Sequence, residues 1–519
     1  MIIEDDKMFD ENYDLSMAMK PCSPCDNIDW LVSIIWPLLF IVGYAIADIY
    51  VFHWFVIPVY LCGVLISTDA VHWCRGKMDT FDPKGLVGLF GCNFFVISPI
   101  LVAYYEVDHA GGLLYLDDMR TWLGWMAVLN FFGILLYKYI EKKISRKPII
   151  VKKYWFDNTA LSAVILPLSI FIIVSCQVYF IISGGGISAY ISSKTYGDVG
   201  SLEGTIGLGP ISVIGRALPI MLLITITNWF RKSGRQVSFM SIAITLLTFL
   251  VAQFLIAGLT GSRAATMWAL FWAGGIIHFF WRTISVKLVI ISIVPLMFFL
   301  YLYGFYKSLG ARSFDIFKGT TSIKNLAYEA KKPFASVFIG DMGRSNVQAG
   351  ILSVVTDPEK EYDFWYGKTY LTSVVPMIPR KLWPSKPGDS GKVIAGTEML
   401  YGKGSYVDRW SEKVGIGRRS SAIYGLAGEA MLNFGVWGIL PAFAVWGFIV
   451  GSIRRRIFSY SAGDMRLLIA PFFMLVSFFM LIQDLDNFAA TSVHNLLVPA
   501  FVVWFISLKT RSQDDMDYI

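Results

Sequence analysis

Charged residues are scarce in this sequence: they occupy 16% of its 519 positions, while hydrophobic residues occupy 55%. A soluble chain of this length would divide into several domains and would carry charge on about a quarter of its residues. Instead, apolar runs of about 18 residues or more recur along the whole chain, and roughly 20 apolar residues cross the hydrocarbon core of a bilayer. The composition excludes a soluble globular protein and predicts an integral membrane protein.

Alternation of polar and apolar residues is also lacking in these runs. A membrane span satisfies its backbone polar groups within a helix or within a closed barrel, whose strands would alternate. The continuous runs therefore predict an all-α fold with about twelve transmembrane helices, although the first two could form one re-entrant hairpin. We place the helices at residues 30–49, 51–68, 85–105, 121–140, 158–183, 210–230, 236–259, 264–281, 286–304, 424–452, 464–483 and 491–508.

Two further features are missing: a leader pattern at the start and a framework of cysteines. Residues 1–28 are polar and acidic, with no basic region ahead of an apolar core, so we expect no cleaved signal peptide. Of the six cysteines, Cys22 and Cys25 form a CxxC that suits a redox pair or half of a zinc site. No second CxxC or histidine pair accompanies it, which favours a structural or incidental role.

Positive charge is concentrated in alternate short loops, and the formal net charge is +7. Because cytoplasmic loops are enriched in Lys and Arg, these loops and both termini are predicted to be cytoplasmic. This reading explains the charge as an orientation signal, without nucleic acid as a partner. The basic residues are Arg75, Lys77, Lys84, Lys138, Lys142, Lys143, Arg146, Lys147, Lys152, Lys153, Arg231, Lys232, Arg235, Arg282, Lys287, Arg454, Arg455, Arg456 and Arg466.

The predicted orientation divides the chain into five parts. These are a cytoplasmic tail at 1–29, helices at 30–304, a large extracytoplasmic loop at 305–420, helices at 421–508 and a cytoplasmic tail at 509–519. The large loop mixes charge, aromatics and proline, and we expect short helices near 322–330 and 334–354, packed against the membrane mouth. A loop of this length without a function is uncommon.

Arginine recurs where predicted helices begin on the outer side. Arg216 lies about two turns into the sixth span, Arg263 opens the eighth, and Arg418 and Arg419 precede the tenth. A helix N-terminus attracts anions, and an arginine within a span is costly unless it has a partner. These residues predict a site for a phosphate-rich, membrane-embedded ligand. The alternatives are snorkelling of Arg263, Arg418 and Arg419 to the headgroups, and a structural ion pair for Arg216.

A carboxylate lies early in the tenth predicted span, where Glu429 and Asn433 share one helix face, one turn apart. A buried Glu is a candidate general base for a sugar hydroxyl, or it orients one of the arginines; the sequence does not separate these roles. The glycines at 425, 428, 435 and 438 would also allow another helix to approach closely, which is the structural interpretation of the same segment.

Weaker candidates lie near the outer ends of the last spans and in the large loop. Asp484 and Asp486 form a DxD that could bind a divalent metal, which we disfavour because nucleotide sugars are cytoplasmic. His494 is more often structural at such a place, though a role as base or sugar contact stays open. Most outer aromatics fit an interfacial belt, with Trp365 or Trp383 as possible sugar contacts.

Several of these strings resemble the Wzy-type O-antigen and capsule repeat-unit polymerases. The resemblance covers about 260–440, and its most specific part is the proline-rich string of the large loop. The strings are Gly261-Ser262-Arg263, then Ile378-Pro379-Arg380-Lys381-Leu382-Trp383-Pro384-Ser385-Lys386-Pro387, and Gly428-Glu429 with Asn433-Phe434-Gly435 and Gly438.

The resemblance implies a GT-C-like glycosyltransferase in the bacterial inner membrane, acting on its periplasmic face on undecaprenyl-diphosphate-linked oligosaccharides. We expect no cofactor and no metal at the reaction site, and whether a chain-length regulator binds stays open. Arginines would stabilise the diphosphate leaving group. The expected catalytic residues are Glu429, Arg216, Arg263 and Arg380, and the expected substrate-binding residues are Arg344, Arg409, Arg418, Arg419, Asn433, Trp383 and His494.

Three other functions compete with a polymerase. An O-antigen ligase would use the same donor with a lipid A core acceptor. A lipid-linked oligosaccharide flippase would predict two similar halves and short loops, whereas this chain has one long late loop. A structural component of an export complex would leave Arg216 unexplained.

Overall fold

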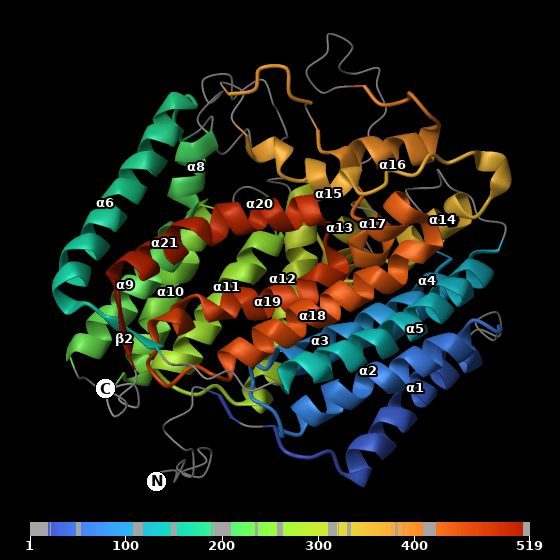
Figure 1. Cartoon of the computed structure of the whole chain (residues 1–519), viewed down its shortest axis with the longest axis horizontal. Coiled ribbons are helices and arrows are strands. Elements are labelled where there is room, and N and C mark those ends of the chain that lie inside the picture. Colours follow the sequence, from blue (N-terminus) through green and yellow to red (C-terminus); the bar gives the residue numbers. More distant parts are fainter. Residues whose placement is uncertain are drawn as a thin grey trace.

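The computed structural model is an α-helical bundle with one two-stranded sheet (Figure 1). Its described residues are 19–20, 22–47, 53–106, 118–146, 153–187, 190, 209–233, 237–256, 263–309, 319, 321–329, 334–378, 382–387, 389–407 and 422–511. In this part of the chain, nine helices are long and apolar enough to cross a membrane, or ten if one bent pair is a single span. The chain is therefore a multi-pass, all-α protein in character, as the sequence predicts.

The first half of the chain forms long apolar helices. Side-chain oxygens of Asp82, Asp118 and Asn158 accept backbone N–H groups at the starts of α3, α5 and α6, as expected for helix N-caps. The helices are α1 (Asn27–Ala47), α2 (Val56–Cys74), α3 (Pro83–Cys92) continued by η3 (Asn93–Ile97) and α4 (Ser98–Tyr104), α5 (Met119–Ser145), α6 (Thr159–Ser183), α8 (Gly209–Arg216), α9 (Leu218–Ser233), α10 (Phe239–Ile256), α11 (Arg263–Phe280) and α12 (Val286–Leu309).

The second half contains shorter helices and breaks. The last predicted span is a pair of helices, α20 and α21, bent by 45° between them. The helices are α13 (Ile323–Glu329), η8 (Val337–Asp341), α14 (Ser345–Val355), η9 (Pro358–Lys360), α15 (Lys368–Thr372), η10 (Val375–Met377), α16 (Gly391–Tyr401), α17 (Gly425–Phe434), η11 (Gly435–Gly438), α18 (Ile439–Ile457), η12 (Met465–Leu468), α19 (Ala470–Ile482), α20 (Leu485–Asn495) and α21 (Leu497–Ile506).

Each predicted span overlaps a helix of the structure. The described parts of α11 and α19, Ala265–Phe280 and Ala470–Ile482, are apolar but are not among the nine helices long enough to cross, so a total of twelve crossings stays a prediction. The most extensive helix contact is between α5 and α18. Glycine allows the two helices to approach this closely: a Cβ on Gly447 would lie 2.7 Å from the carbonyl oxygen of Tyr137, which is too close for a side chain.

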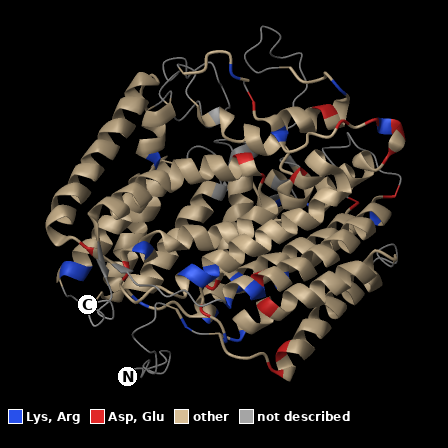
Figure 2. Cartoon of the chain, viewed as in Figure 1, with Lys and Arg blue, Asp and Glu red and all other residues tan. Residues whose placement is uncertain are grey.

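The loops that are predicted to be cytoplasmic meet at one end of the bundle. Strand β1 (Lys153–Asp157), which follows α5, pairs antiparallel with β2 (Ser507–Arg511) at the end of α21. The Thr80 hydroxyl, after α2, donates to the Ile284 carbonyl before α12 at 2.7 Å. Figure 2 shows charged residues gathered at this end and around the large loop, with few on the helices between. The shared side of these loops agrees with the charge pattern; which compartment they face stays a prediction.

The large loop is folded, and part of it belongs to the bundle. Helix α13 and the pair η8–α14 lie where short helices are predicted, whereas α15 and α16 are additional. Helix α14 packs against α4, α5 and α17, with Ala349 and Ile351 fully buried, so it is a core element as well as a cover. Helices α15 and α16 lie over α17 and contact it (Figure 1).

Single-cysteine labelling tests the orientation. In a background with all six native cysteines replaced by serine, Lys360→Cys and Lys403→Cys should react with a membrane-impermeant maleimide on intact cells. Arg146→Cys, Ser233→Cys and Arg456→Cys should react only after permeabilisation, because positive loops stay inside. Labelling of Lys360→Cys only after permeabilisation would reverse the orientation and contradict an outward site.

Candidate functional site

A buried polar cluster lies where the large loop meets α17 and α20. Helix α17 begins at Gly425, whose φ of +69° favours glycine. A Cβ at this position would also lie 2.5 Å from the Leu481 carbonyl oxygen, so a larger residue would not fit. Glu429 and Asn433 lie one turn apart on α17 and are 3% and 0% exposed. The sequence-predicted pair therefore faces inward, toward the cluster.

Two carboxylates cap two helices reciprocally. Asp484 Oδ1, just before α20, accepts the N–H groups of Tyr424 and Gly425 at the start of α17, at 2.8 and 2.7 Å. Glu429 Oε2, on α17, accepts the Leu485 N–H at the start of α20, at 2.7 Å. A negative charge at a helix N-terminus is stabilised by the helix dipole. The start of α17, which the sequence suggested as a phosphate site, therefore already holds a carboxylate of the chain itself.

Asn433 fastens the large loop to the end of α17. Its Nδ2 donates to Thr369 Oγ1 at 2.6 Å and to the Glu429 carbonyl at 2.8 Å, and its Oδ1 accepts the Gly367 N–H at 2.9 Å. The Thr369 hydroxyl in turn donates to Glu429 Oε1 at 2.9 Å. Both carboxylate oxygens of Glu429 are thus hydrogen-bonded, which fits an orienting role better than a free base.

Lys392 supplies the cluster's cation, and sequence reasoning missed it. Its Nζ lies 2.9 Å from Asp484 Oδ2 and 3.6 Å from Asp486 Oδ1, and the Ser390 hydroxyl donates to Asp486 Oδ2 at 2.7 Å. Burial disfavours the ammonium, but the two carboxylates outweigh burial and hold the pKa of Lys392 above its usual range. The ammonium occupies the space between the DxD carboxylates, which further disfavours a metal there. No motif marks Lys392, because its partners lie 92 and 94 positions away in the sequence.

The charge of the cluster decides which ligand it suits. Three carboxylates, those of Glu429, Asp484 and Asp486, face one ammonium among the described residues. The excess of negative charge disfavours a diphosphate here. A diphosphate would need the arginines elsewhere.

Arg216 ends α8, which packs against α20, and its electrostatic neighbours are His494 on α20 and Tyr190. No carboxylate of the described chain forms an ion pair with Arg216, so the structural pair considered above is not found in that part. His494 Nδ1 lies 2.6 Å from the Ala490 carbonyl oxygen. A carbonyl only accepts, so we assign the proton to Nδ1, which leaves Nε2 able to accept. The structure thus brings two predicted site residues together.

The other predicted residues are placed as follows. Arg344 is buried, and it donates to the Ile482 carbonyl at 3.1 Å and to the carbonyls of Gly340 and Gly343. These hydrogen bonds join η8 to the end of α19. Trp383 lies on the loop surface, 39% exposed. Helix α11 begins at Arg263, whose side chain lies outside the described part. Four predicted arginines lie outside the described residues: Arg380, Arg409, Arg418 and Arg419.

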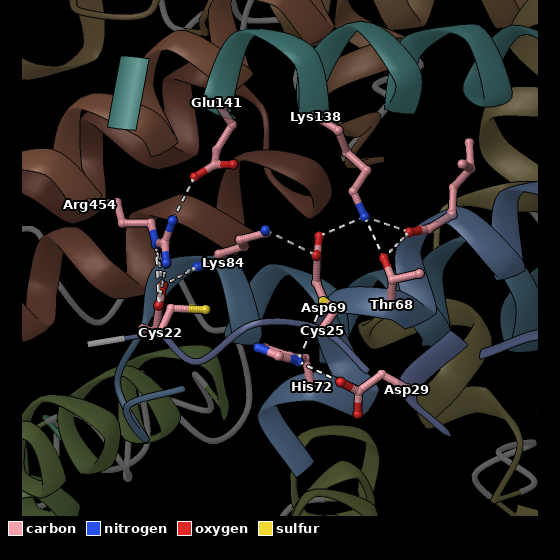
Figure 3. Close-up of polar contacts among 12 residues, drawn as sticks. Cys22, Cys25, Asp29, Thr68, Asp69, His72, Lys84, Lys138, Glu141 and Arg454 are labelled. Carbon is pink, nitrogen blue, oxygen red and sulfur yellow. Dashed lines mark hydrogen bonds and ion pairs between the residues drawn. The ribbon is translucent and has the colours of Figure 1, made fainter. Parts of the chain in front are cut away.

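A second polar network lies at the opposite end of the bundle (Figure 3). Arg454 on α18 pairs with Asp82 at 2.9 Å and with Glu141 at 3.3 Å. Asp69 on α2 pairs with Lys138 at 3.0 Å and with Lys84 at 3.4 Å; Figure 3 shows both pairings. The sequence analysis interpreted these basic residues only as orientation signals, although Asp69, at the end of an apolar run, could have indicated a buried partner. Since each named charge is paired, the network is an architectural one.

Replacing Lys392 should destabilise the protein through its partner. Lys392→Met leaves Asp484 buried without its cation, which costs about 3–5 kcal/mol. Adding Asp484→Asn should restore part of the loss, because an amide oxygen can still accept from the start of α17. Melting temperatures in detergent measure this, with Lys403→Met as control, since the Lys403–Asp363 pair is exposed. A Lys392→Met protein as stable as the control would show that the pair contributes nothing.

Comparison of the chain with protein-family models, curated proteins and solved structures finds no match. The resemblance to Wzy-type polymerases therefore rests on the strings in the sequence, and the site on its own geometry.

Proposed function

We propose that this protein is a polysaccharide polymerase of the bacterial inner membrane. It would transfer a growing glycan from undecaprenyl diphosphate to a hydroxyl of an incoming lipid-linked repeat unit. The bond between the anomeric carbon and the diphosphate oxygen breaks, and a bond from that carbon to the acceptor oxygen forms. The hydroxyl proton leaves to a base, and the diphosphate leaves as an anion.

The observation that carries the proposal is Arg216, an arginine at the end of an apolar helix with no carboxylate partner among the described residues. By comparison, Arg344 donates to a backbone carbonyl and Arg454 pairs with carboxylates. Arg216 itself is exposed at the end of this apolar helix. In a hydrocarbon layer an unneutralised guanidinium is costly, and a ligand diphosphate would compensate for it. Arg263, which opens α11, is proposed to complete the clamp together with Arg380.

The proton acceptor is best assigned to His494. Its Nδ1 is bonded to the Ala490 carbonyl, and it lies in the electrostatic neighbourhood of Arg216. Glu429, with both oxygens bonded, is proposed to position Thr369 and the large loop. The large loop around α15 would then receive the acceptor sugar, with Trp383 and the segment around it as a further sugar contact.

A single-substrate assay separates a polymerase from its rivals. Purified protein in lipid vesicles, supplied with one lipid-linked repeat unit as both donor and acceptor, should form chains of more than one unit. A ligase would form product only when lipid A core is added, and a flippase would form none. Failure to elongate the repeat unit that the host organism makes would contradict the proposal.

Substitution of Arg216 should separate chemistry from stability. Arg216→Ala should insert and melt like the wild type and yet lose polymer longer than one unit, because the diphosphate loses its counter-charge. Arg216→Lys should recover little, since a point charge lacks the bidentate fork of guanidinium. The measurement is the polysaccharide ladder on a gel beside membrane abundance and melting temperature.

Arg120→Ala is the matched control, an outer-end arginine whose partner Glu106 is 79% exposed, and it should leave polymer length unchanged. A well-folded Arg216→Ala protein that makes long chains would remove Arg216 from the site.

A further inference from the structure

The segment before α1 lies across the end of α2 and brings together side chains that suit a metal ion. The Ser23 N–H donates to the Lys77 carbonyl at 3.0 Å, which holds the segment in place. One ligand atom from each of Cys25, Asp29 and His72 lies within 4.8 Å of the other two. Figure 3 shows these side chains close together. Among the described residues, no other group of His, Cys, Asp and Glu has this spacing.

The hydrogen bonds of His72 favour a metal at one ring nitrogen. His72 Nε2 lies 2.7 Å from the Ser23 carbonyl oxygen, and because a carbonyl only accepts, Nε2 carries a proton. His72 Nδ1 faces Asp29 Oδ2 at 2.9 Å and Cys25 Sγ at 3.5 Å. Nδ1 therefore needs a second proton or a metal ion between these groups. Metal-bound histidines are commonly oriented in this way, with the other nitrogen donating to a backbone carbonyl.

The donor set indicates the class of metal. A thiolate, an imidazole nitrogen and a carboxylate oxygen are the ligands of zinc, and hard ions such as magnesium do not favour sulfur. Cys22 precedes Cys25 at the CxxC spacing with which two thiolates reach one zinc ion. Both cysteines are exposed. The Cys22 side chain lies beside Arg454 (Figure 3), so it would have to turn from there to reach the site.

The surrounding charge accommodates a divalent ion. Asp29 also pairs with Arg75 and with Lys77, the latter at 2.9 Å, and Lys77 pairs with the neighbouring Asp26 at 2.7 Å. These two acids and two bases balance one another. Zinc with two thiolates adds no net charge, so the ion enters without disturbing that balance.

We propose that Cys22, Cys25, Asp29 and His72 Nδ1 bind one zinc ion, which fastens the segment before α1 to the end of α2. Binding releases the two thiol protons, and any proton on Nδ1, to solvent. The site is structural and independent of the proposed polymerase activity, since it lies at the end of the bundle opposite the carboxylate cluster.

Metal content tests the proposal. Full-length protein purified with reductant, loaded with zinc and desalted, should hold about one zinc per chain by elemental analysis. Cobalt in place of zinc should give thiolate-to-metal absorption. Cys22→Ser and Cys25→Ser should each lose the stoichiometric metal and the absorption, whereas Cys74→Ser should keep both. Cys74 is the matched control, because it is an exposed cysteine two positions from His72 that the site does not use.

Melting temperature gives a second readout. Zinc should raise it in the wild type and in Cys74→Ser but not in Cys25→Ser, because a ligand that binds only the folded state stabilises that state. A wild-type protein without zinc after loading would overturn the proposal. Serine variants at 22 or 25 that match Cys74→Ser in metal content, or a Cys22–Cys25 disulfide that persists with reductant, would overturn it as well.

Discussion

The requirement that every charge in an apolar layer has a partner governs this structure. At one end of the bundle Arg454 is held by Asp82 and Glu141, and Asp69 by Lys84 and Lys138. Each carboxylate lies where a cation from another helix reaches it, so the pairs fix which helices are neighbours. Removing either partner would leave an uncompensated buried charge, which is more costly than the pair is favourable. Against this background Arg216, which has no carboxylate partner among the described residues, is informative.

The same requirement explains how the long outer loop becomes part of the fold. A helix N-terminus leaves N–H groups unsatisfied, and Asp484 and Glu429 each satisfy those of the other's helix. The loop contributes Thr369 to one carboxylate and Lys392 to the other. Its short helices are therefore tied to α17 and α20 by buried polar bonds, although no disulfide is present among the described residues.

The helices could be predicted from sequence because a span is a local property: about twenty apolar residues in a row suffice. The inward face of Glu429 and Asn433 followed from their spacing, and the shared side of the basic loops from charge. The partners could not be predicted. Lys392 and Asp484 meet only after the loop folds back onto the bundle. Lys84 and Lys138 are indistinguishable in sequence from other basic residues of the cytoplasmic loops, but in the structure both pair with the buried Asp69. In the structure Arg344 donates to backbone carbonyls, which its sequence context does not indicate, and substrate binding by Arg344 stays a prediction.

Helix α20 links the two chemically distinct regions and gives the proposed reaction a direction. Asp486, at its start, belongs to the carboxylate cluster, and His494, near its end, lies by Arg216, about 12 Å away at 1.5 Å per residue. Where water is excluded, charges at this distance still act on a ligand, because screening is weak. A diphosphate is drawn to Arg216 and repelled by Asp484 and Asp486, whereas a neutral sugar is tolerated at both. Because His494 takes the acceptor's proton in the proposed reaction, the reacting hydroxyl would lie with the diphosphate at the Arg216 end of α20. The rest of the neutral acceptor sugar could extend toward the Asp486 end, where the diphosphate is disfavoured.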